Sequence, residues 1–210
     1  MRQLGLDALP WTPGLRQWRA RVRCLREWMP ELAQGEAPLP DLSDAALLER
    51  LDAWLKPALS GKSRLDALDE AAFGDALRSL CDWSWRQKLD ALAPTRIVVP
   101  SGMERAIEYG YDDHADDGRG AAQAPVLAVK LQELFGLADT PRIGDGRVPL
   151  TLHLLSPAGR PLQVTQDLRG FWERTYPEVK KEMKGRYPKH PWPDDPWTAK
   201  ATHRAKPRGT

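Results

Sequence analysis

Basic and aromatic side chains alternate within a stretch of thirteen residues near the C-terminus of this 210-residue chain. Lysine and arginine neutralise the phosphates of nucleic acids, and aromatic rings stack on unpaired bases. The pattern therefore predicts nucleic-acid binding, with no preference for sequence. In the alternative, Tyr187 and Trp192 fasten this stretch to the rest of the protein, and the lysines are merely solvated. The candidate binding residues of the stretch are Lys180, Lys181, Lys184, Arg186, Tyr187, Lys189 and Trp192.

The distribution of charge also favours a polyanionic partner. The formal net charge is +2, but residues 169–210 contain eleven basic and five acidic side chains, so the first 168 residues are slightly acidic. A basic segment on an acidic body suggests nucleic acid, although a solvated tail gives the same count.

No residue pattern indicates catalysis or a metal site. Gly61-Lys62-Ser63 lacks the earlier glycine that a phosphate loop needs, because position 56 is lysine. The aspartates and histidine of 112–117 do not have the spacing of a calcium loop. Neither the four histidines nor Cys24 and Cys81 have zinc spacing. We therefore expect this chain alone to have no catalytic residue, no metal and no cofactor.

Composition restricts the location of the protein. No uncharged apolar run is long enough to span a membrane, and the N-terminus does not have the pattern of a secretory signal. Two cysteines cannot form a disulfide framework, so we expect a cytoplasmic protein without membrane contact.

Residues 1–93 are predicted to be helical. From Leu15 onward, apolar residues recur at steps of three and four, which is typical of the buried face of a helix, and Pro30 marks its end. Two more helices are expected, over about 47–55 with Ser43 or Asp41 as N-cap, and over about 70–92 with Trp83 facing inward.

Residues 94–168 are predicted to contain short strands. The expected elements are a strand at 96–99 pairing with 104–111, a hairpin tip at 112–120, a strand and helix over 126–137, and a hairpin of 148–155 with 161–165. Short strands with one inserted helix are typical of a small barrel or sandwich, including the oligonucleotide-binding (OB) class. The predicted fold class is thus α+β, with an N-terminal helical segment followed by an OB-like β-barrel.

Residues 169–210 are predicted to form a basic extension, a helix followed by an extended arm. Thr175-Tyr-Pro-Glu178 fits a capping box at the start of the helix, and Gly185 is a suitable end. Four prolines within 186–197 exclude a helix there and predict polyproline II structure or a docked arm.

Several long runs resemble the C-terminal region of HrpB-type bacterial ATP-dependent RNA helicases of the DEAH-box class. The resemblance is strongest from about residue 83 onward and extends weakly to Leu4-Gly-Leu6 and Leu9-Pro-Trp11. The runs are Leu92-Ala-Pro94 leading to Val99–Gly102, Pro125–Leu137, Arg147–Leu168, Phe171-Trp172, Lys181–Pro193 and Ala205–Arg208.

This resemblance implies an ATP-driven motor on RNA, followed by winged-helix, helical-bundle and OB-like modules. The chain has no phosphate loop and no DEAH box, so ATP and Mg²⁺ would belong to motor domains that it lacks, and we expect a C-terminal fragment. On this basis 1–93 is the end of the helical bundle, 94–168 the OB-like domain and 169–210 the extension.

Two functions follow from the resemblance. In the first, the chain is a non-catalytic accessory region that assists single-stranded RNA (or DNA) binding or motor regulation, with Arg105 and Arg160 on strand turns as further contact residues. In the second, the extension is a structural interdomain clamp that docks on the motor domains of the parent helicase without touching RNA.

Overall fold

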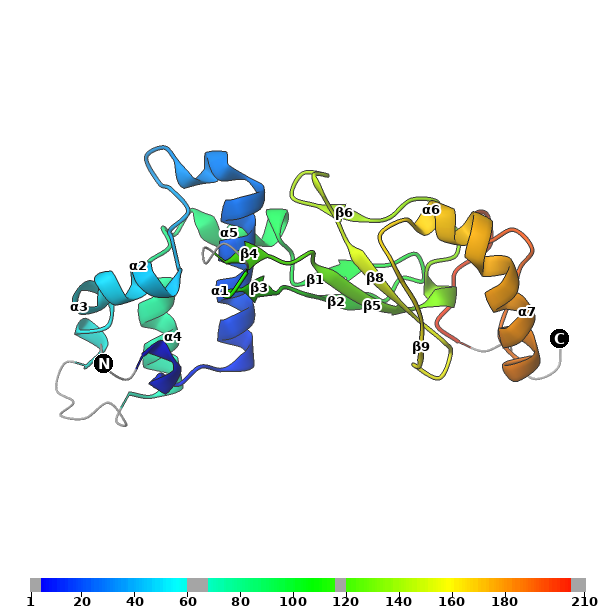
Figure 1. Ribbon diagram of the computed structural model, residues 1–210, viewed down its shortest axis with the longest axis horizontal. Helices are drawn as coiled ribbons and strands as arrows, with labels where there is room; N and C mark the ends of the chain where they lie inside the picture. Colours follow the sequence, from blue (N-terminus) through cyan, green and yellow to red (C-terminus); the bar gives the residue numbers. More distant parts are fainter. Residues whose placement is uncertain (1–4, 60–67, 116–119, 205–210) are drawn as a thin grey trace. The chain divides into compact units, whose positions relative to one another are not determined.

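The computed structural model describes residues 5–59, 68–115 and 120–204, which fall into two compact units (Figure 1). The first unit contains the chain up to Ala93 together with 109–123, and the second contains 94–108 together with the chain from Ala124. Gly61-Lys62-Ser63 lies outside the described residues. The predicted division into 1–93, 94–168 and 169–210 stays a prediction.

The first unit is built from short helices around a longer one. Its helical segments are η1 (Leu6–Ala8), α1 (Pro13–Trp28), η2 (Pro30–Ala33), α2 (Asp44–Glu49), α3 (Leu51–Trp54), η3 (Pro57–Leu59), α4 (Glu70–Arg78) and α5 (Trp85–Leu92).

Helix α1 confirms the predicted apolar stripe. The Thr12 hydroxyl accepts a hydrogen bond from the Leu15 amide at 3.1 Å, and Pro13 takes the first helical position, where its missing N–H is harmless. Val22 and Leu25 are fully buried. The helix ends at Trp28, before Pro30, as expected.

Each of the two later predicted helices is divided. Ser43 caps α2 as predicted, but the chain leaves helical geometry at Arg50. The expected helix over 70–92 breaks between Arg78 and Trp85, where the Asp82 carboxylate accepts the Ser84 amide at 2.8 Å. This local turn directs Trp83 outward with 72% exposure. The prediction that Trp83 faces inward is therefore wrong.

A hairpin from the middle of the chain completes the first unit. Its strands β3 (Tyr111–Asp112) and β4 (Ala121–Ala122) pair antiparallel and lie beside α1 (Figure 1). The Glu27 carboxylate on α1 accepts the Ala122 amide at 3.0 Å.

The second unit is built on a mixed five-stranded sheet with the order β1-β2-β5-β8-β9. Neighbouring strands are antiparallel except β5 and β8, which run parallel. Leu127, Val129, Leu152 and Leu154 on the two central strands are buried. The strands are β1 (Arg96–Val98), β2 (Glu104–Glu108), β5 (Val126–Lys130), β8 (Thr151–Leu155) and β9 (Pro161–Thr165), with a small separate pair β6 (Arg142–Ile143) and β7 (Val148–Pro149).

The mixture of helix and sheet agrees with the α+β class, but the OB-like barrel is not confirmed. Among the described strands β1 and β9 are the two edges of an open sheet. The predicted helix within 126–137 is only the single turn η5 (Leu131–Glu133), because Lys130 is still extended and Gly136 takes a positive φ of 82° soon after.

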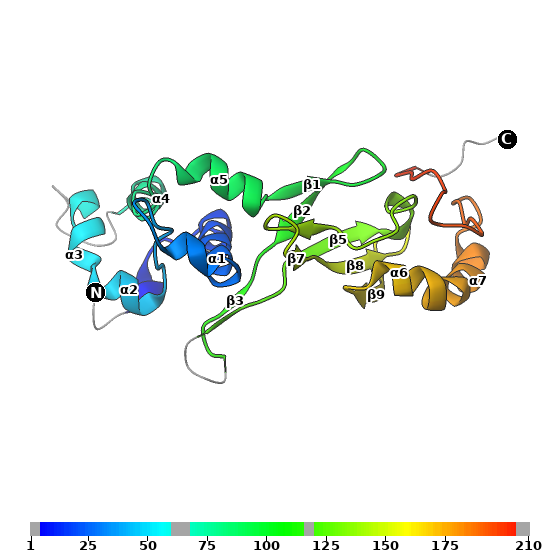
Figure 2. The same cartoon turned by 90° about the horizontal axis from the view of Figure 1, so that it is seen from above.

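The C-terminal helix begins earlier and ends later than expected. Segments α6 (Leu168–Gly170), the π-helical η6 (Phe171–Thr175) and α7 (Tyr176–Arg186) form one continuous run (Figure 2). Asp167 caps this run by accepting the Gly170 amide at 2.8 Å. Thr175 directly precedes α7 as expected, but its side chain makes no capping hydrogen bond, because the backbone before it is already helical. Gly185 lies inside the helix rather than after it.

The segment after α7, which we call the arm (residues 187–204), is docked on its own unit. Its Pro196 carbonyl accepts the Gly136 amide at 2.8 Å, and its Thr202 amide donates to the Gln132 carbonyl at 3.0 Å. The expected docked, non-helical arm is confirmed.

Candidate nucleic-acid interface

Three of the predicted lysines line one groove of about 560 Å³ between α7 and the arm. Lys180, Lys181 and Lys184 share one face of α7 with Pro177, because their spacing follows the helical repeat. We call this the lysine groove. Its lining residues are Trp172, Glu173, Tyr176, Pro177, Lys180, Lys181, Lys184, Asp194, Pro196 and Trp197.

The lysines of this groove are not equivalent. The Lys180 ammonium donates to the Asp194 carboxylate, and this contact lowers the pKa of Asp194. Lys181 and Lys184 are exposed, and neither forms an ion pair within the described part of the chain. Two positive charges are thus open to an anion.

Aromatic residues form the floor of the lysine groove. Trp172 and Tyr176 are each 2% exposed. The Trp172 indole donates to the Leu137 carbonyl at 2.8 Å, and the Tyr176 hydroxyl donates to the Pro193 carbonyl of the arm at 2.9 Å. Burial raises the pKa of Tyr176, so the hydroxyl remains a donor. The floor is rigid, and half-buried Trp197 forms part of the wall.

A second, smaller pocket of about 240 Å³ lies at the opposite face of α7, against the turn between β8 and β9. It brings together three predicted residues that are distant in sequence: Arg160 from the turn, and Arg186 and Tyr187 from the end of α7. We call it the arginine pocket. Its lining residues are Ser156, Arg160, Pro161, Leu162, Val179, Glu182, Met183, Arg186 and Tyr187.

The other predicted residues line neither the lysine groove nor the arginine pocket. Arg105 donates two hydrogen bonds of 2.7 Å to the carboxylate of Glu133, and this pairing raises the pKa of Arg105. Lys189 is exposed on the arm. The Trp192 indole donates to the Tyr187 carbonyl at 3.0 Å, so its polar group is engaged by a bond within the arm itself.

The sequence patterns missed several residues of this interface. Trp172 and Tyr176 are one helical turn apart, and that spacing could have marked them as neighbours had the helix been extended upstream of Thr175. Asp194 and Glu133 carried no signal, because their partners Lys180 and Arg105 are 14 and 28 residues away.

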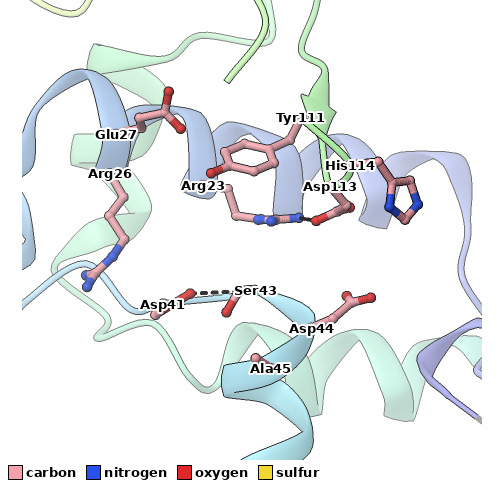
Figure 3. A pocket seen from close by; sticks show the side chains of 10 residues that line it. All are labelled: Arg23, Arg26, Glu27, Asp41, Ser43, Asp44, Ala45, Tyr111, Asp113 and His114. Atoms are coloured by element: carbon pink, nitrogen blue, oxygen red, sulfur yellow. Dashed lines mark hydrogen bonds and ion pairs between the residues drawn. The ribbon is translucent and has the colours of Figure 1, made fainter. Parts of the chain in front are cut away.

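A cavity of about 620 Å³ in the first unit is not part of the candidate interface (Figure 3). Its lining carries four carboxylates against two arginines. The Arg23 guanidinium lies 2.5 Å from Asp113 and 3.7 Å from the centroid of the Tyr111 ring. Burial and a hydrogen bond with Glu27 raise the pKa of Tyr111 to about 12. The contacts of Arg23 hold the β3–β4 hairpin, and the surplus of two negative charges in the lining disfavours a phosphate.

Metal and membrane sites are not apparent in the described residues. No group of three or more potential ligands among them could hold a metal ion. None of their helices combines the length and apolarity needed to cross a membrane.

Comparison with known proteins assigns this chain to a family. The family model described as "ATP-dependent helicase C-terminal" (HrpB_C) matches residues 54–196. This chain belongs to the HrpB C-terminal helicase family. The resemblance inferred from the sequence is thereby confirmed.

Relatives of this HrpB C-terminal chain agree in sequence and in structure. It is 46% identical over 206 residues to the ATP-dependent RNA helicase HrpB of Escherichia coli, covering 98% of the chain and 24% of the relative. A crystal structure of the E. coli DExH-box NTPase HrpB matches 97% of the chain with a TM-score of 0.82 at 46% identity. A crystal structure of the E. coli DEAH/RHA helicase HrpB matches 91% with a TM-score of 0.69 at 44% identity. The chain covers 23% and 22% of these two structures, so it spans about a quarter of the length of its relatives.

Proposed function

We propose that this chain is a non-catalytic accessory region of an ATP-dependent RNA helicase that helps to hold single-stranded RNA in the lysine groove. The observation that carries the proposal is the pair of exposed ammonium groups, Lys181 and Lys184, above a floor of buried aromatic rings. In this role the chain works in the cytoplasm beside motor domains, and those domains would bind ATP and Mg²⁺.

The chemistry of the groove suits a strand without base pairs. Ammonium groups contact backbone phosphates and release counterions, which gives affinity for any sequence. Pro177 and half-buried Trp197 supply apolar surface to unpaired bases. The Arg169 guanidinium lies 6.0 Å from the centroid of the Trp197 ring, so a base would stack on the part of the ring that Arg169 leaves open. Lys180 contributes less than its neighbours, because Asp194 neutralises it.

The test is RNA binding by a charge-reversed variant. We expect Lys181→Glu/Lys184→Glu to weaken binding of a fluorescein-labelled single-stranded 12-mer by about tenfold or more in fluorescence anisotropy at low salt. Loss of two phosphate contacts would also lower the slope of log K against log salt by about 1.4. The matched control is Arg50→Glu/Lys56→Glu, an equal charge change at exposed positions of the first unit. Equal affinity of all three proteins would contradict the proposal.

A second candidate function, the interdomain clamp, is favoured by the docked arm. Tyr176, Gly136 and Gln132 all bind its backbone, so the arm is a fixed element on which a motor domain could rest. If the clamp is correct, deleting residues 187–210 from a complete helicase abolishes RNA-stimulated ATP hydrolysis and leaves RNA affinity unchanged. If RNA holding is correct, affinity falls with the lysine substitutions while basal ATP hydrolysis continues.

A further inference from the structure

We propose that the arginine pocket is a subsite for a single nucleotide unit, with its phosphate between Arg160 and Arg186 and its base or ribose against Tyr187. This inference rests on the proposed RNA-holding function and adds to it the path of the strand. The two arginines reach the pocket from segments 26 residues apart, and neither forms an ion pair among the described residues.

The turn that carries Arg160 is fixed before any ligand arrives. The Ser156 amide donates to the Arg160 carbonyl at 2.8 Å, and the Arg160 amide donates to the Ser156 hydroxyl at 3.0 Å. The Gly159 amide also donates to the Ser156 carbonyl at 2.8 Å. These three bonds occupy the backbone of the turn and leave the exposed Arg160 guanidinium to a ligand.

The opposite wall of the pocket is a face of α7. Val179, Glu182, Met183 and Arg186 follow the helical repeat and so share that face. Met183 is buried and anchors it. The Tyr187 amide donates to the Met183 carbonyl at 2.7 Å, which holds the tyrosine at the end of the helix. Tyr187 is half-buried, with one ring edge near His190 at a centroid distance of 6.2 Å.

Charge and size define the ligand. Two arginines and one glutamate give the pocket a surplus of one positive charge, which suits a phosphodiester. Its volume of about 240 Å³ is below the range of about 300–1,000 Å³ of pockets for drug-sized ligands. A space of this size holds at most one nucleotide unit and excludes a base pair.

The location of the pocket implies a route for the strand. The lysine groove and the arginine pocket lie on opposite faces of α7, so one strand can occupy both only by wrapping around the exposed side of the helix. A helix with its side chains is about 10–12 Å across, and a very short oligonucleotide cannot span that distance and still fill both sites. The affinity for single-stranded RNA should therefore rise sharply at the length at which one oligonucleotide reaches both the lysine groove and the arginine pocket.

Anisotropy titrations with labelled single-stranded RNA of 3, 6, 9 and 12 nucleotides test this inference. We expect Arg160→Ala/Arg186→Ala to weaken binding of the 12-mer by about tenfold and binding of the 3-mer by less, because the lysine groove alone can bind a 3-mer. Glu182→Gln should strengthen binding of the 12-mer by about threefold, because it removes the negative charge of the one acidic side chain that lines the pocket. Tyr187→Leu should weaken it, and Tyr187→Phe should not.

The control is Arg86→Ala/Arg96→Ala, which removes two exposed arginines away from the pocket. Suppose that Lys181→Glu/Lys184→Glu weakens binding of RNA of every length, whereas the Arg160, Arg186, Glu182 and Tyr187 variants bind RNA as the control does. The proposed subsite is then overturned, and the lysine groove remains the RNA-binding site. If neither set weakens binding, the proposed function itself fails. Binding of a fluorescent polyglutamate peptide that is lost in the same arginine variants would overturn the nucleotide assignment in favour of an acidic peptide.

Discussion

Arg105 donates two hydrogen bonds to a carboxylate that solvent does not reach. The Glu133 side chain is 1% exposed and the Arg105 side chain 29% exposed. The geometry is bidentate, with both distances at 2.7 Å, which is the strongest arrangement for this pair of groups. Arg105 therefore stabilises the second unit, and we do not include it in the proposed RNA surface.

Removing one member of this pair should destabilise the protein. We expect Arg105→Ala to lower the free energy of unfolding by about 2–3 kcal/mol in urea titrations, because it leaves a buried negative charge without a partner. The double variant Arg105→Ala/Glu133→Leu should recover most of the loss, since it leaves no charge there. A double variant no more stable than Arg105→Ala would show that the pair is not the source of the stability.

The chemistry of single residues could be predicted from the sequence only where neighbours along the chain decide it. The lysines of α7 lie together because the helical repeat places them together, and that repeat is visible in the sequence. The partner of Arg105 is 28 residues away, and the partner of Trp192 is a backbone carbonyl. Neither of these two contacts can be recognised from the order of residue types along the sequence.

At the scale of elements, the misplaced start of the C-terminal helix has a physical reason. Pro177 has no N–H, so a proline at this position usually marks a first turn. Here the π-helical turn Phe171–Thr175 comes directly before Tyr176, so the helical run enters α7 from upstream, and the proline still lies in the first turn of α7. A sequence pattern with a period of 3.6 residues does not detect such a turn.

The arm should loosen on mild acidification. Burial, and then the nearby Lys130, lower the pKa of His190 below its ordinary value of 6.5, and its Nδ1 lies 3.3 Å from the Gln132 amide nitrogen. Because the docked imidazole binds its proton less readily than the free one, docking is strongest above about pH 6.5 and weakens below it. We expect protection of the Thr202 amide in hydrogen exchange to fall between about pH 7 and pH 5. His190→Gln should remove this dependence, and an unchanged fall in that variant would refute the assignment.

At the scale of the whole molecule, the chain enters each unit more than once. Residues 109–123 belong to the first unit although strands on both sides of them belong to the second. Gln17 on α1 explains this: its amide nitrogen donates to the Tyr109 carbonyl at 3.0 Å, and its amide oxygen accepts the Tyr109 amide at 2.9 Å. These partners are 92 residues apart, so no pattern along the sequence indicates that the hairpin returns to α1.

The second unit should fold without the first once this hairpin is removed. Strands β2 and β5 are antiparallel neighbours, with Glu108 opposite Val126, so a two-residue Asn-Gly turn can join them. We expect residues 94–210 with 109–125 replaced by Asn-Gly to give a dispersed NMR spectrum and a cooperative thermal transition. The same segment with the hairpin retained would expose Tyr109 and its neighbours and should aggregate more readily. A molten or unfolded protein in the first case would contradict the independence of the two cores.

The return of the hairpin to α1 also constrains how this region can change during evolution. In most multidomain chains a module lies between two cut points, and recombination can duplicate, delete or exchange it as one block of coding sequence. Here a single cut after residue 93 separates Gln17 from Tyr109, because Tyr109 belongs to the first unit but follows strand β2 of the second unit in sequence. A single cut therefore does not separate the two units, and an exchange that takes the sheet alone must also replace the segment 109–123.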